Sequence, residues 1–83
     1  MSDVNWLTEL TETESRPAAG DIAAALHDMA PLRAAAVRAR LAGFELAEIM
    51  DMYGWPYEKA LHLVAHGMND LRRLLVERGV VAA

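Results

Sequence analysis

Residues 45–78 read ELAEIMDMYGWPYEKALHLVAHGMNDLRRLLVER, and this stretch decides the fold. Apolar residues recur every three or four positions on both sides of a three-residue break that starts at Gly54, which is the pattern of two amphipathic helices. A glycine commonly follows the end of a helix, and a proline such as Pro56 suits the first turn of the next one. We therefore expect a helix over about Glu45–Tyr53, a tight turn, and a long helix over about Pro56–Arg78.

Two shorter helices are expected upstream of this stretch. Apolar residues at helical spacing predict them over about Asp21–Met29 and Pro31–Ala42. Asp21 is the expected N-cap of the first helix, and Pro31 opens the second, which Gly43 ends. Strand signals are nearly absent, because apolar and polar residues do not alternate cleanly and β-branched residues are few. The sequence therefore predicts an all-α fold, a small bundle of four to five helices.

The first twenty residues form an acidic arm that differs from the rest of the chain. A short helix over about Asp3–Leu10 has Trp6 on its apolar side, and a polar linker over Thr11–Gly20 follows it. We therefore divide the chain into an N-terminal arm, residues 1–20, and a helical domain, residues 21–83.

The acidity of the chain is concentrated in its first third. Residues 1–28 hold six acidic residues and one arginine, a net charge of −5, whereas residues 29–83 hold seven basic and six acidic residues, a net charge of +1. An acidic leader of this kind is usually a solvated segment, and less often it covers a basic surface of a partner. Composition favours the solvated segment.

Composition excludes several classes of protein. Of the 83 residues 54% are hydrophobic, which is too many for an intrinsically disordered chain. Charged residues interrupt every apolar run before it reaches the length of a membrane span, and no cysteine is present for a disulfide or a Cys-based zinc site. The N-terminus lacks a signal-peptide pattern, so we expect a cytoplasmic protein without a membrane partner. Seven arginines against one lysine, with frequent alanine, are typical of a high-GC bacterium or its phage.

Four local features follow one another between residues 32 and 78. They are Ala42-Gly43-Phe44, Glu48-Ile49, Gly54 and the closing Leu71-Arg72-Arg73-Leu74-Leu75. In this order and spacing they resemble region 4 of bacterial sigma-70-type factors, especially the extracytoplasmic-function kind. The resemblance implies a helix-turn-helix domain whose second helix enters the major groove of promoter DNA, and contact with RNA polymerase. It predicts a small transcription regulator that acts on DNA or on the transcription machinery.

The helix that matches the recognition helix departs from the family by its charge. It carries a single lysine where the family has several basic residues, and Glu58 and Asp70 lie beside it. Because contacts between cations and phosphates supply most non-specific affinity, we expect DNA binding to be weak. A grouping of the arginines on one side with the lysine favours DNA binding, and their scattering among acids argues against it. The candidate DNA-binding residues are Lys59, His62, His66, Asn69, Arg33, Arg38, Arg40, Arg72 and Arg73.

A protein-interaction module that keeps the fold without binding DNA is the alternative. Beyond its core stripe the last helix has surplus apolar surface, which includes Gly67 and is more than so small a bundle buries easily. This surface pairs with a second copy, giving a dimer or larger homo-oligomer, or binds another protein. A third arrangement, in which the N-terminal helix covers it, stays open. The candidate interface residues are Trp6, Trp55, Tyr57, Leu63, Leu74 and Val76.

Side chains that carry chemistry are few. His62 and His66 lie four positions apart and share a helix face, where such a row senses pH, ligates a metal or arises by chance. No third strong ligand pattern accompanies them, so we expect no metal site and no cofactor. Glu45 and Glu48 suit the N-terminus of a helix, where the dipole favours acids. The sequence has no Cys nucleophile, no serine with a paired base and no Gly-rich phosphate loop, so we expect no enzyme.

Overall fold

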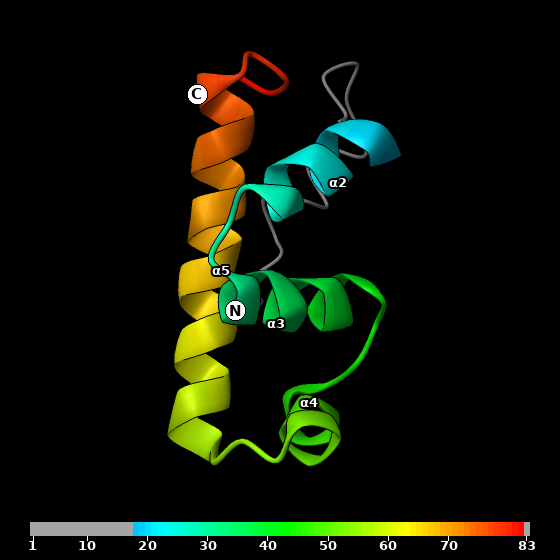
Figure 1. The fold of residues 1–83 in the computed structure, drawn as a ribbon, viewed down its shortest axis with the longest axis vertical. Helices are drawn as coiled ribbons and strands as arrows, with labels where there is room; N and C mark the ends of the chain where they lie inside the picture. Colours follow the sequence, from blue (N-terminus) through cyan, green and yellow to red (C-terminus); the bar gives the residue numbers. More distant parts are fainter. Residues whose placement is uncertain (1–17, 83) are drawn as a thin grey trace.

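The structure is a computed structural model that describes residues 18–82. Over this part of the chain there are four helices and no strand: α2 (Ala19–His27), α3 (Pro31–Leu41), α4 (Leu46–Tyr53) and α5 (Tyr57–Glu77). Figure 1 shows their arrangement. The prediction of a small all-α bundle is confirmed. Among the described helices, none combines the length and the apolar character needed to cross a membrane.

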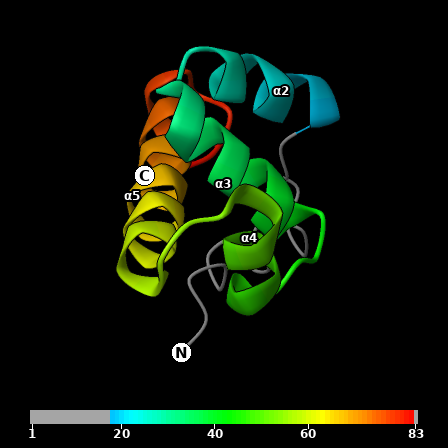
Figure 2. The ribbon, with the colours of Figure 1, turned by 60° about the horizontal axis from the view of Figure 1, so that its bottom comes forward.

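The long helix α5 is the element on which the other three helices pack. Its 21 residues span about 31 Å at the usual rise of an α-helix. Figure 1 and Figure 2 show α2, α3 and α4 in a row along one side of α5. α2 lies near the C-terminal part of α5, α3 crosses its middle, and α4 lies near its N-terminal end. The row therefore covers one face of α5, and no other described helix covers the opposite face.

The core fills the space between α5 and this row. The buried residues of α5 recur every three or four positions, so they form one stripe along the helix. Facing them, α3 contributes mainly alanines, which allow the two helices to come close together. The largest side chains that are fully buried are Ile49, Met68, Leu71, Leu75 and Val37.

The crossing of α3 over α5 depends on Gly67. A Cβ atom added at Gly67 lies 2.5 Å from Cγ2 of Val37 and 2.9 Å from the carbonyl oxygen of Arg33. Since Cβ atoms essentially never approach other atoms so closely, only glycine fits at this position. The interpretation of Gly67 as surplus surface is therefore wrong, because α3 covers it.

The predicted helix boundaries agree with the structure to within one residue for α3, α4 and α5. The helix α2 begins and ends two residues earlier than predicted, so its first residues belong to the segment interpreted as a linker. Asp21 is not the N-cap. It is the third residue of α2, where its carboxylate accepts a hydrogen bond from the N–H of Ala18 at 3.3 Å and stabilises the first turn. The predicted helix over Asp3–Leu10 lies outside the described residues.

Hydrogen bonds define both ends of α4 and the turn that joins it to α5. At its start, the N–H of Glu45 donates to the carboxylate of Glu48 at 2.9 Å, which confirms the expected place of these two acids. At its end, Gly54 has a φ of +67°, a conformation that side chains with a Cβ rarely adopt. The N–H of Trp55 then donates to the carbonyl of Met50 at 3.1 Å. Gly54 and this last hydrogen bond turn the chain within the three residues between α4 and α5.

The end of α5 is closed by a second left-handed glycine. Gly79 has a φ of +72°, and the N–H of Val80 donates to the carbonyl of Leu75 at 2.9 Å, the pattern of a Schellman motif. The turn brings Val81 back onto the bundle, where it is buried.

Replacement of Gly67 by alanine tests the importance of the α3–α5 crossing. We expect the free energy of unfolding to fall by about 1–3 kcal/mol, because the added methyl group overpacks the contact with Val37 and Arg33. Urea denaturation followed by circular dichroism measures this change.

The matched control is Gly20→Ala. Gly20 also lies inside a helix, but no atom lies within 4 Å of an added Cβ. Since alanine is the better helix former, this variant keeps its stability or gains up to about 1 kcal/mol. Equal effects of the two substitutions would contradict the account of the crossing.

Candidate interaction surfaces

The face of α5 that points away from the other helices brings together several of the candidate DNA-binding residues. Lys59, His62, His66, Asn69 and Arg73 recur every three or four positions and are all exposed. This spacing places them on one face of the helix, opposite the buried stripe. We call these five residues the outward face of α5. It carries one lysine and one arginine, far fewer cations than the resemblance implies.

Two stacked aromatic rings lie near Lys59, at the N-terminal end of the outward face. The ring of Tyr53 stacks on that of Trp55, with centroids 4.4 Å apart and planes 17° from parallel. Nζ of Lys59 lies 6.0 Å from the centroid of the Trp55 ring, at the outer limit of a cation–π contact. Trp55 itself is only 9% exposed. Trp55 was predicted to belong to a partner interface, but its side chain packs in the core beside the turn and leaves little surface for a partner.

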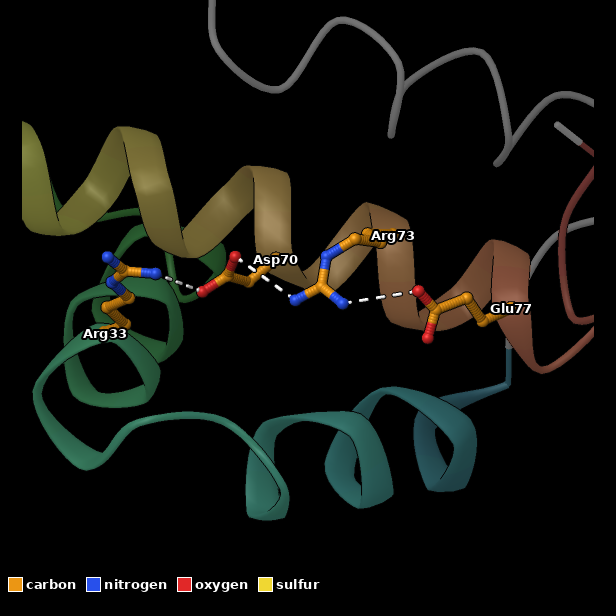
Figure 3. A network of polar contacts seen from close by, with 4 residues as sticks. All are labelled: Arg33, Asp70, Arg73 and Glu77. Carbon is orange, nitrogen blue, oxygen red and sulfur yellow. Dashed lines mark hydrogen bonds and ion pairs between the residues drawn. The ribbon is translucent and has the colours of Figure 1, made fainter.

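A chain of ion pairs joins α3 to α5 and uses two of the candidate arginines. Nη1 of Arg33 lies 2.7 Å from Oδ2 of Asp70, and Nη2 of Arg73 lies 3.5 Å from Oδ1 of the same carboxylate. Nη1 of Arg73 also lies 3.3 Å from Oε2 of Glu77. Figure 3 shows the four side chains in a row along α5. The network holds two positive and two negative charges, so it is neutral.

The network acts on the titration of Asp70. The hydrogen bond from Arg33 holds the pKa of the Asp70 carboxyl below its ordinary value of 3.8. Partial burial acts in the opposite direction, and the charges of Arg33 and Arg73 lower the pKa further. The carboxylate therefore stays ionised and paired at neutral pH. A separate ion pair between Arg78 and Asp28 connects the end of α5 to the end of α2.

The remaining candidate arginines do not form one basic surface with the outward face. Arg38 and Arg40 belong to the C-terminal half of α3, which extends away from α5 in Figure 1. Nη1 of Arg40 donates to the carbonyl oxygen of Phe44 at 3.3 Å. Arg72 is exposed on α5. Within residues 18–82, no ion pair engages these three arginines. The five candidate arginines are thus spread over two helices, and acids neutralise two of them.

The predicted partner interface also differs from what the structure presents. Leu63, Leu74 and Val76 are half-buried and pack against the core, so they are edges of the bundle rather than a protruding stripe. Tyr57, in contrast, is 55% exposed, as an interface residue has to be. Trp6 lies outside the described residues.

Four exposed apolar residues were missed by the sequence analysis. Met52 is 49% exposed and Tyr53 42% exposed, and both lie at the end of α4, a few positions before Tyr57 in the sequence. The other two, Leu32 and Phe44, lie at the start of α3 and before α4. Met52 and Tyr53 lie at the end of α4, next to the turn, where apolar residues are not covered by another helix. Their closeness to Gly54 was the feature of the sequence that could have predicted their exposure.

Several acids lie close in sequence to Met52, Tyr53 and Tyr57. Glu45, Glu48 and Asp51 are exposed on and just before α4, which contains no basic residue, and Glu58 is exposed at the start of α5. We call the residues Asp51, Met52, Tyr53, Tyr57 and Glu58 the turn end of the molecule. In the part of the chain that the structure describes, no three His, Cys, Asp or Glu side chains gather closely enough to hold a metal ion.

Comparison with known proteins found no relative of this chain. No family model matches it, and neither a curated protein nor a solved structure does. The resemblance to sigma region 4 therefore rests on the pattern of residues 32–78 alone. The function has to be argued from the surfaces that the bundle exposes.

Replacement of Asp70 by asparagine tests the ion-pair network. At pH 7 we expect the free energy of unfolding to fall by about 1 kcal/mol or less, since the paired side chains are partly exposed to solvent. Because the pKa of Asp70 is lowered by folding, its stabilisation is complete above pH 3.8 and is lost as the pH falls further.

Thermal unfolding of the two proteins between pH 7 and pH 2.5 measures this dependence. The wild-type protein is expected to lose more stability below about pH 4 than the variant, so the two curves converge in acid. Asp51→Asn is the control, because no ion pair engages Asp51 within residues 18–82. If Asp51→Asn changed the pH profile as much as Asp70→Asn, the network would not explain it.

Proposed function

We propose that this protein is a small protein-interaction module that keeps a helix-turn-helix arrangement and binds another protein through its turn end. The arrangement is α4, the three-residue turn after Tyr53, and α5. The proposal takes the alternative that the sequence left open, and the charge of α4 carries it.

The acidic surface of α4 is the observation that argues against DNA as the main ligand. In a helix-turn-helix bound to DNA, the first helix of the motif crosses the phosphate backbone. The exposed charges at that helix here are those of Glu45, Glu48 and Asp51, and no basic residue of α4 compensates them. Phosphates would repel this surface, and the loss of cation–phosphate contacts removes most non-specific affinity.

The apolar residues of the turn end favour a protein as the partner. Met52, Tyr53 and Tyr57 lie within six positions of one another, and each is at least 42% exposed. Exposed apolar patches with a polar border are typical of protein interfaces, and tyrosine and methionine are enriched there. The acids Asp51 and Glu58 are exposed and adjoin Met52 and Tyr57 in the sequence. A partner with arginine or lysine around an apolar centre complements both features.

A paired substitution at the turn end tests this proposal. We expect Met52→Ser with Tyr57→Ser to weaken partner binding at least tenfold, because central aromatic residues supply much of the affinity of an interface. Both side chains are about half exposed, so the fold should be kept. The measurement begins with affinity capture from nuclease-treated lysate of the source cells and identification of the captured proteins. The affinity of each is then determined with purified components. RNA polymerase and a second copy of the chain are included among the proteins tested.

Leu32→Ser is the matched control. Leu32 is 50% exposed, similar to Met52, but lies at the start of α3. A partner that binds the wild-type protein and the Leu32 variant, but not the paired variant, supports the proposal. Partners that bind all three proteins equally would contradict it.

A helix-turn-helix transcription regulator that contacts DNA is the second candidate. The outward face of α5 supports it, because Lys59, His62, His66 and Asn69 are exposed on one side of the helix that corresponds to the recognition helix. Polar and cationic side chains on such a face are those that read base edges and phosphates.

This second candidate predicts that Lys59 makes one of few phosphate contacts. Lys59→Gln would then lower the affinity for duplex DNA about equally for all sequences and reduce the salt dependence by about one charge. Fluorescence anisotropy at several salt concentrations measures both effects. Arg78→Gln is the control, since Arg78 pairs with Asp28 away from the outward face.

A further inference from the structure

We propose that His62 and His66 form a binding site for one divalent transition-metal ion, such as Zn²⁺ or Ni²⁺, on the outward face of α5. The proposal is independent of the function proposed above, and it departs from the expectation of no metal site because the two rings lie close together. The two histidines lie one helical turn apart, and their ring centroids are 5.9 Å apart with planes at 71°. Both side chains are exposed. Imidazole nitrogen is a good ligand for zinc, nickel and copper.

The distance between the rings suits two ligands of one ion. Zinc binds a histidine nitrogen at about 2.0–2.1 Å, so two ligating nitrogens lie roughly 3–4 Å apart. The nitrogens of two rings that face a common point are closer together than the ring centroids, which are 5.9 Å apart here. Because both side chains are on the surface, small rotations about their torsion angles can bring the nitrogens into place without disturbing the core.

Neighbouring charged groups leave the two imidazoles available. Within residues 18–82, no hydrogen bond or ion pair engages His62 or His66. Asp70, one turn beyond His66, is held by two arginines, and the ammonium group of Lys59 lies near the Trp55 ring. Glu58, one turn before His62, is the nearest acid on the other side along the helix.

The site has two protein ligands and open positions. No cluster of three ligating side chains exists among the described residues, so water completes the coordination of the ion. The affinity is therefore lower than that of a closed structural zinc site, and the ion adds positive charge to a face with few cations. Because the ligands are one turn apart on the same helix, binding also stabilises the folded state.

Calorimetric titration of the untagged full-length protein with Zn²⁺, and separately with Ni²⁺, tests the proposal. We expect one ion per chain, and a dissociation constant at least tenfold higher for His62→Gln and for His66→Gln than for the wild type. The unfolding temperature should rise by several degrees with excess metal in the wild type and not in the double variant.

The control is His27→Gln. His27 is the third histidine of the chain, is exposed on α2 and has no histidine one turn away. This variant should bind metal like the wild type. Wild-type protein that binds neither ion at millimolar concentration would overturn the proposal. So would unchanged affinity in the His62 and His66 variants, with circular dichroism confirming that all variants are folded.

Discussion

The close approach of α3 to α5 at Gly67 is the contact on which the rest of the structure depends. It places the backbone of Arg33 against α5, and from there the side chain of Arg33 reaches Asp70. α2 and α4 precede and follow α3 directly, so their positions along α5 follow from this crossing. In a domain with so thin a core, one contact of this kind carries a large share of the packing.

The same crossing determines which charges remain for function. Arg33 and Arg73 flank Asp70: the pair with Arg33 connects α3 to α5, and the pair with Arg73 lies within α5. Two of the arginines that a DNA-binding regulator would use for phosphate contacts are therefore paired with an acid of the bundle. What the bundle exposes instead is a lightly charged outward face on α5 and an acidic, aromatic turn end. These surfaces are the basis on which we propose a protein rather than DNA as the ligand.

Most of the fold was predictable because its signals are local. Helical periodicity and the positions of glycine and proline placed α3, α4 and α5 to within one residue. The predicted bounds of α2 were two residues too late, because an acid in the first turn of a helix resembles an N-cap in sequence.

The surfaces were harder to predict because they depend on distant residues. The partner of Arg33 lies 37 positions away, and no spacing rule connects the two. Trp55 beside a turn was interpreted as exposed, whereas stacking with Tyr53 and packing on the core bury it. The role of Gly67 required knowledge of what crosses it. The candidates on the outward face of α5 came from the resemblance to a recognition helix, and only the His62/His66 row followed from helical spacing, which needs no tertiary information.

The measurement that tests the central claim most directly is a titration of fluorescently labelled random duplex DNA with the wild-type protein at low salt, with light scattering on the same sample. The account predicts no saturable binding, because the exposed charges at α4 are acidic and two arginines are paired. Tight binding that weakens steeply with added salt would contradict it and would favour the DNA-binding regulator instead.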